Sequence, residues 1–311
     1  MSCLITPSVA SAQSDGVRGL NLPTPLSLQP SYEYESVYAP PEAPREDEGL
    51  NEGGVHIELA VSYLTDYMFR GIDRSESLEL ADPVGVVPPN FQPSGSEDAA
   101  NLQIYSKLEW DFGRLPHPFL GVFVNVYDAD PVSQFQEIRP FFGAEWTIRP
   151  FILAGGSNSF IFPDRDPFNT AEVFASLTID DSYFFRTDRP VLSPYVFAAY
   201  DYDLYDGLYM EAGLNHEIEF EDLDIVIIGR AHVAYVESNT QFIYLDAGED
   251  SGWHHYQVGM TGRYMLNDVL RIPARYGDWS FEGYVYYTDG IDNDLRSNTQ
   301  VWGGGGIRFE Y

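Results

Sequence analysis

The sequence is poor in cysteine and in basic residues, and it has no long apolar run. Its 311 residues include a single cysteine, Cys3, which excludes a disulfide framework. Only 17 lysines and arginines stand against 48 acidic residues, and the formal charge of −31 repels phosphate backbones, which argues against nucleic-acid binding. No apolar run approaches the ~18 residues of a membrane helix, so a helical membrane protein is excluded. A soluble acidic protein or a β-barrel remains.

The first 53 residues have the composition of an exported leader and tail. Residues 1–13 carry a short apolar stretch and then Ala10-Ser11-Ala12, the small-residue pattern that signal peptidase cleaves. No basic residue precedes the stretch and Pro7 interrupts it, so we expect a truncated signal peptide, with a disordered N-terminus as the alternative. Residues 14–53 hold six prolines and an acidic run, a composition that cannot fold alone. We expect a disordered periplasmic tail over 14–53 and a folded domain over 54–311.

From Val55 onward, apolar and polar side chains alternate with the period of a β-strand. In the first segment the polar face carries Glu58, Asp66 and Arg70. The apolar face is formed by Val55, Ile57, Leu59, Val61, Tyr63, Tyr67 and Phe69. The alternating segments are 54–70, 101–112, 118–128, 136–148, 151–161, 168–179, 191–202, 207–220, 223–236, 253–267, 278–288 and 299–311.

Twelve segments make an even number, as in bacterial outer-membrane barrels, whose short periplasmic turns alternate with longer external loops. The connections mostly follow this rule, with a long segment at 71–100 and a short one at Arg149-Pro150. The exceptions are 180–190 and 268–277, which are long for internal turns, and 203–206, which is short for an external loop. The sequence therefore predicts an all-β fold: a closed antiparallel transmembrane β-barrel of about twelve strands in the cell outer membrane, with both chain ends periplasmic.

Aromatic residues gather near the ends of these segments, as in the two interfacial girdles of membrane barrels. The residues concerned are Trp110, Trp146, Trp253, Trp279, Tyr63, Tyr67, Tyr200 and Tyr287. The last segment alternates up to the terminal Tyr311 and resembles the C-terminal signature that the barrel-assembly machinery reads. Outer-membrane lipid and that machinery are therefore the expected partners.

The first segment also resembles a known family. Ser62 to Ile72, SYLTDYMFRGI, is similar to the opening motif of the TorF-like (Gcw_chp) outer-membrane porin family, in which a Thr/Ser-x-Tyr-x-x-Arg-Gly pattern closes the first strand. Thr65, Tyr67, Arg70 and Gly71 match in register. The likeness covers one strand closely, and the Pro-rich tail and the long first loop depart from the family. The resemblance implies an outer-membrane transport barrel and names no solute.

The inward face is rich in charge, with acids about twice as numerous as bases. In a water-filled lumen such charges set the field on a permeating ion, which favours passive passage of small solutes or ions with a cation preference. The alternative is a network of arginines, carboxylates and tyrosines that fills the barrel and makes it a structural or surface-interaction protein. The candidate pore-lining residues are Glu58, Asp66, Arg70, Lys107, Glu109, Glu137, Arg139, Glu145, Glu172, Glu211, Glu217, Arg230, Arg263, Glu282 and Arg308.

Other chemistry has weaker support. External loops collect aspartates, as in Asp289-Gly290-Ile291-Asp292-Asn293-Asp294, which either ligate Ca²⁺ or form a solvated rim of turns. His216 is the one histidine expected on the lipid face, and no serine motif lies beside it, so we expect no enzyme. His232 is expected inside, whereas the adjacent His254 and His255 should point to opposite faces, which disfavours a metal site. No cofactor motif appears.

Overall fold

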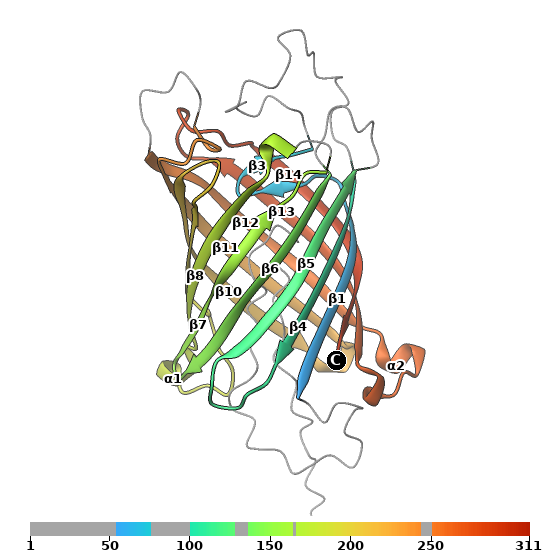
Figure 1. Ribbon diagram of the computed structural model, residues 1–311. Coiled ribbons are helices and arrows are strands. Elements are labelled where there is room, and N and C mark those ends of the chain that lie inside the picture. The colour runs from blue at the N-terminus through green and yellow to red at the C-terminus, as the bar shows by residue number, and fades with distance from the viewer. Residues whose placement is uncertain (1–53, 76–99, 128–135, 164–165, 244–250) are drawn as a thin grey trace, which may run out of the picture.

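The chain forms one closed antiparallel β-barrel of twelve strands (Figure 1). The structure is a computed structural model that describes residues 54–75, 100–127, 136–163, 166–243 and 251–311. The signal peptide and tail expected in 1–53 lie outside these residues. Around the barrel each strand pairs with its neighbours in sequence, and β1 closes the ring on β14, with Val61 opposite Ile307. Closure leaves no open sheet edge. A protein that crosses a membrane with strands needs such closure, because unpaired backbone groups cannot face lipid.

Each of the twelve predicted segments contains or overlaps one barrel strand, which confirms the predicted fold class. Two further strands, β2 (Met68–Phe69) and β3 (Ile72–Asp73), form a separate small sheet. The barrel strands are β1 (Val55–Leu64), β4 (Asn101–Trp110), β5 (His117–Tyr127), β6 (Glu137–Ile148), β7 (Phe151–Phe160), β8 (Thr170–Ile179), β9 (Tyr195–Asp201), β10 (Gly207–Phe220), β11 (Ile225–Glu237), β12 (Ser251–Met265), β13 (Asp278–Gly290) and β14 (Gln300–Glu310).

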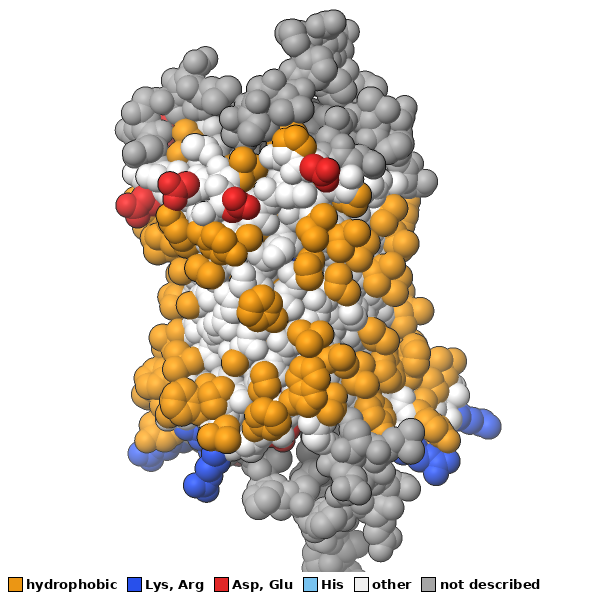
Figure 2. Space-filling model, viewed as in Figure 1, with side chains coloured by type: hydrophobic (Ala, Val, Ile, Leu, Met, Phe, Trp, Pro, Cys, Tyr) orange, Lys and Arg blue, Asp and Glu red, His pale blue; other side chains and the backbone are white. Residues whose placement is uncertain are grey.

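The alternation places apolar side chains outside and polar ones inside. On β1, Val61 is 47% exposed whereas the adjacent Ser62 is 1% exposed. Figure 2 shows the consequence on one face, where many apolar side chains lie on the outer surface, with acidic groups near one end and basic groups near the other. Large apolar side chains are exposed on strands around the ring, as with Leu120 on β5, Val196 on β9 and Val301 on β14. A soluble protein does not leave so many uncovered, so the exterior is that of a transmembrane β-barrel.

The two ends of the barrel differ in their connections. β1 begins and β14 ends at one end, which we call the turn end, and the opposite end is the loop end (Figure 1). The two unexpectedly long turns contain short helices, α1 (Ser182–Phe185) and α2 (Asn267–Leu270) with the 3-10 turn η3 (Ala274–Tyr276). Two further 3-10 turns are η1 (Asp166–Phe168) at the loop end and η2 (Glu221–Leu223) at the turn end. No helix among the described residues is long and apolar enough to cross a membrane.

Trp110, Trp146 and Trp279 all lie near the turn end of their strands, as the sequence predicts. Trp146 is 42% exposed on the outer surface, and its indole nitrogen donates a hydrogen bond to the carbonyl oxygen of Arg114 at 3.1 Å. We expect these three indoles at the membrane interface, where an apolar ring and a polar N–H are both accommodated. Depth-dependent fluorescence quenching in liposomes tests this. Strongest quenching by a probe at the bilayer centre would contradict the register.

Candidate functional site

The chain turns into the barrel after β1, and this is where the first predicted strand is wrong. β1 ends at Leu64 instead of continuing to residue 70, and residues 65–75, which we call the luminal hairpin, fold back inside the loop end (Figure 1). Tyr67 and Phe69, predicted to face lipid, are each 1% exposed in the interior. The alternation continues through the hairpin, so it cannot distinguish a longer wall strand from an inward turn.

A two-residue turn closes the luminal hairpin. Phe69 pairs with Ile72, so Arg70 and Gly71 are the central residues, and both have positive φ, 50° and 82°. Tight hairpin turns of this length need such angles, which glycine supplies without steric cost. The base of the hairpin is fixed by the Ser75 hydroxyl, which accepts a hydrogen bond from the Tyr67 backbone N–H at 2.8 Å.

Two arginines join the luminal hairpin to distant parts of the wall. Arg70 donates two hydrogen bonds to the Glu172 carboxylate on β8, at 2.8 and 2.7 Å. Arg74 pairs with Glu137 on β6 at 2.7 Å. Counted around the barrel from β1, β6 is three strands away and β8 is five, close to the opposite wall. The hairpin therefore crosses the bore and is held by buried, charge-assisted bonds.

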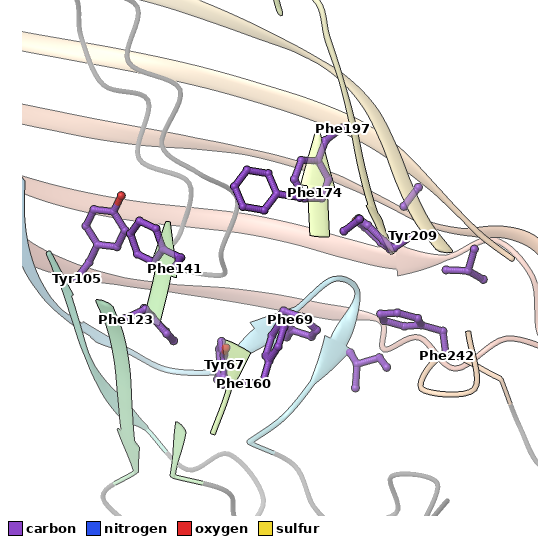
Figure 3. Packing of buried hydrophobic residues seen from close by; sticks show 14 of the residues in the cluster. Tyr67, Phe69, Tyr105, Phe123, Phe141, Phe160, Phe174, Phe197, Tyr209 and Phe242 are labelled. Carbon is purple, nitrogen blue, oxygen red and sulfur yellow. The ribbon is translucent and has the colours of Figure 1, made fainter. Parts of the chain in front are cut away.

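Aromatic packing accompanies these ion pairs. The ring of Phe69 packs edge-on against Phe160 on β7 at 5.8 Å, and Tyr67 lies 6.0 Å from Phe123 on β5. The Arg70 guanidinium lies over Tyr209 on β10, 4.6 Å from the ring centroid. Figure 3 shows the hairpin lying among these side chains. An eight-stranded barrel is filled by its side chains alone, so a twelve-stranded one has room for this additional layer.

Glu137 is the centre of the most highly connected group in the lumen. Its carboxylate accepts hydrogen bonds from Arg74, from Arg139 on the same strand and from the Tyr67 hydroxyl. Burial lowers the pKa of Arg74, but Glu137 and the surrounding tyrosines together raise it by more, so the net pKa lies above its ordinary value. Arg74 therefore remains a cation in the hairpin. Arg74 is not among the residues predicted from the sequence.

One loop at the loop end bonds to the luminal hairpin, and a second packs beside it on β10. The backbone N–H of Asn298 donates to the Gly71 carbonyl at 2.8 Å, and its side-chain oxygen accepts from the Asp73 N–H at 2.9 Å. From the β11–β12 connection, Phe242 packs 5.7 Å from Tyr209 and is completely buried. The hairpin is thus held by wall strands on one side and by loop residues on the other.

All fifteen predicted pore-lining residues lie inside the barrel. Fourteen are buried and Glu217 is half-buried, while Asp66 and Arg70 belong to the luminal hairpin and not to the wall. At least six of the nine candidate carboxylates are paired with a basic side chain. The pairs are Glu58 with Arg308, Glu109 with Lys107, Glu137 with Arg139, Glu172 with Arg70, Glu211 with Arg230 and Glu282 with Arg263.

The histidine prediction is half right. His216 is exposed on the outer face, with its Nδ1 2.5 Å from the carbonyl oxygen of Val191, and His232 faces inward. His254 and His255, however, are both buried, where opposite faces are predicted. A β-bulge explains this, because the register between β11 and β12 shifts there and Ala234 stands opposite both histidines. Nothing in the local sequence signals the bulge.

The acidic loop residues within the described ranges make turns. The Asp201 carboxylate accepts from the N–H groups of Asp203 and Tyr205 at 3.2 and 3.0 Å, and Asp292 accepts from the N–H of Asp294 at 3.0 Å. These are the side-chain bonds expected of turn-forming aspartates. No group of His, Cys, Asp or Glu in the described part of the chain is arranged to hold a metal ion. The acidic segments around Asp128 and Asp246 lie outside the described residues.

Comparison with known proteins finds likeness in architecture. No family model and no curated protein matches the sequence. Among solved structures, the NanC porin has a TM-score of 0.45 at 8% identity, covering 81% of this chain and 98% of that one. A FadL homologue from Pseudomonas aeruginosa has a TM-score of 0.38 at 9% identity, covering 83% and 90%. A bacterial polysaccharide outer-membrane secretin has a TM-score of 0.32 at 10% identity, covering 82% and 98%. At these values the likenesses assign neither a family nor a solute to the chain.

Proposed function

We propose that the protein is a porin-like outer-membrane barrel for passive passage of small solutes or ions, and that the luminal hairpin closes it in the conformation described. The observation that carries the proposal is the hairpin itself, which crosses the bore from β1 and binds Glu137 and Glu172 on far strands. A wall of twelve strands does not need such a segment to close its hydrogen bonds, so the hairpin serves the lumen. The four matching residues of the TorF-like motif all lie in this hairpin; they are Thr65, Tyr67, Arg70 and Gly71.

The proposal carries no cation preference for the closed state. A charged lumen selects ions through its unpaired charge, and at least six of the nine candidate carboxylates are neutralised by an arginine or lysine at contact distance. Glu109 and Glu211, for example, each have a basic neighbour within 3 Å. Selectivity in an open state stays a prediction, to be read from reversal potentials once a conducting form is available.

The plugged structural barrel is the second candidate, and the same hairpin favours it. If the luminal hairpin never leaves, then the buried ion pairs only make the barrel rigid, and the exposed acidic loops are left to bind other components of the envelope. The two functions differ in one property, because a gated passage must conduct when the hairpin is released and a structural barrel must not.

Planar-bilayer conductance of an Arg70→Gln, Arg74→Gln double variant separates them. Removing one partner from a buried ion pair costs about 3–5 kcal/mol. The docked hairpin therefore loses two anchors, whereas Glu137 and Glu172 gain water when it leaves. We expect a rare, low conductance from the unmodified barrel and a rise of roughly 100-fold or more in open time for the variant.

The matched control is an Arg263→Gln, Arg308→Gln double variant. It also removes two buried arginines, but their ion pairs with Glu282 and Glu58 join neighbouring wall strands. Its conductance should stay at the level of the unmodified barrel. Both variants must first show heat-modifiable mobility as folded barrels. A folded hairpin variant that conducts no more than the control contradicts the passage and supports the structural barrel.

A further inference from the structure

Three buried histidines form a continuous row beside the luminal hairpin. His254 Nδ1 lies 2.8 Å from His255 Nδ1, and His255 Nε2 lies 3.3 Å from His232 Nε2. At its far end, His254 Nε2 lies 2.5 Å from the backbone oxygen of Arg296. The row thus runs from a loop at the loop end, past the hairpin, to β11, and the β-bulge makes it possible by turning both residues of β12 inward.

The backbone oxygen fixes the direction of the hydrogen bonds. A carbonyl can only accept, so His254 carries its hydrogen on Nε2 and accepts at Nδ1. His255 must then donate from Nδ1 and accept at Nε2, and His232 must donate from Nε2. Each neutral imidazole has one donor and one acceptor, so this order uses the full capacity of the first two rings.

One nitrogen is left with a lone pair and no hydrogen bond. His232 Nδ1 is buried, has no hydrogen-bond partner among the described residues, and lies 3.5 Å from Oε1 of Glu211. Two acceptors therefore face each other in the interior. Glu211 already accepts from Tyr195, Tyr209 and Arg230, so its charge is retained and a proton on His232 Nδ1 would lie between the two acceptors.

The row also touches the turn of the luminal hairpin. Gly71 packs directly on His255, because a Cβ atom built on this glycine would lie 2.5 Å from the imidazole Nδ1. Arg70 lies over Tyr209, whose ring stacks with that of His255 at 6.3 Å. The charged and titratable groups around the row are Arg70 from the hairpin, Tyr209 and Glu211 from β10, Tyr195 from β9, and Arg230 from β11.

We propose that His232 Nδ1 is a proton-binding site and that a proton bound there weakens the docking of the luminal hairpin. This inference rests on the proposed function, because it makes the hairpin a closure that pH controls. The added proton forms the His232 Nδ1–H bond, and the hydrogen on His232 Nε2 stays in place. His232 is then an imidazolium that donates to Glu211 from Nδ1 and, from Nε2, to His255, on which Gly71 packs.

The sign of the effect follows from the charges. In the docked state the luminal hairpin covers the histidine row, so the imidazolium of His232 forms away from water and the proton binds weakly. When the hairpin leaves, Arg70 withdraws and water reaches the row, so the proton binds more tightly. A ligand that prefers one state shifts the equilibrium towards it, so acid favours release. One linked proton changes the ratio of released to docked hairpin by at most about tenfold per pH unit.

The test measures hairpin exposure directly, in the full chain reconstituted in liposomes. Cys3 is replaced by Ser and Ile72, buried in the hairpin, by Cys. Maleimide labelling is followed at pH 7.5, 6.5 and 5.5, and each rate is divided by that of the urea-unfolded protein at the same pH to remove thiol ionisation. We expect the normalised rate to rise towards about tenfold per pH unit between pH 6.5 and 5.5.

Two variants make the test specific. His232→Gln keeps a donor near the Nε2 position and removes the titrating nitrogen, so its labelling should be independent of pH. His216→Gln, the matched control on the outer face, should keep the full rise. Hydrogen exchange of amides 67–75 in the unmodified chain, corrected for intrinsic rates, gives the same readout if the cysteine variant does not fold.

Two results would overturn the proton site: exposure that ignores pH in a folded barrel, or a rise that persists in His232→Gln. Conductance is recorded on the same samples. A barrel whose hairpin exposure follows pH through His232 but which never conducts keeps the proton site and loses the passage. A barrel that conducts but whose hairpin exposure does not follow pH keeps the passage and loses the proton site.

Discussion

Replacing Gly71 by Ala is expected to expel the luminal hairpin from its docked position. Gly71 has φ +82°, which costs an L-residue about 1–2 kcal/mol, and its new Cβ would lie 2.5 Å and 2.6 Å from two ring atoms of His255. Overpacking of this kind adds about 1–3 kcal/mol. A total of about 2–5 kcal/mol corresponds to a rise of roughly 30- to 5000-fold in maleimide labelling of Cys at position 72, measured at pH 7.5.

Gly113 supplies the matched control. It also has positive φ, +67°, but lies in a turn at the turn end with no atom within 4 Å of the Cβ position. Gly113→Ala therefore introduces the unfavourable positive φ without a steric clash, and it should leave the labelling of position 72 unchanged. Equal labelling of the Gly71 and Gly113 variants would show that the hairpin turn does not pack on His255 as described.

Glu137→Gln is expected to cause the largest loss of stability among single substitutions in the lumen. Arg74, Arg139 and Tyr67 all donate to this carboxylate, and the amide would leave two buried guanidinium groups without their counter-ion. Removing one partner of a buried pair costs about 3–5 kcal/mol, and two cations here depend on one anion. Urea unfolding in lipid vesicles, followed by tryptophan fluorescence, measures the loss.

A surface pair gives the comparison. Glu219 pairs with Arg189 at the turn end, where Arg189 is 46% exposed and water screens the charges. Glu219→Gln should leave the urea midpoint within error of the unmodified chain. If both substitutions shift the midpoint equally, then the Glu137 cluster does not hold the hairpin to β6.

The number and position of the wall strands can be predicted from sequence because a strand with one lipid face and one inner face has a local signature of period 2. The luminal hairpin could not be predicted from the sequence because its residues keep the same alternation of apolar and polar side chains. Tyr67 and Phe69 are apolar in either setting, whether they meet lipid or the rings of Phe123 and Phe160. The available signal is Arg70-Gly71 between Phe69 and Ile72, which has the form of a two-residue hairpin turn.

The candidate site, too, could be predicted only in part. The inward direction of the charged residues follows from alternation, but their partners do not. Glu172 lies 102 positions from Arg70, and only the closed order of strands brings the two together. The histidine row depends on the bulge between β11 and β12, which one strand's pattern cannot reveal because it is a mismatch between two strands.

The most direct test of the central claim is liposome swelling with a barrel in which residues 66–75 are replaced by ten glycines and serines. The hairpin is then absent while β1 and the rest of the ring are unchanged. We predict that vesicles with this barrel swell in small neutral sugars, and that vesicles with the unmodified barrel swell far more slowly. A folded, hairpin-free barrel that admits no sugar would contradict the account, since the bore would then be closed by something other than the hairpin.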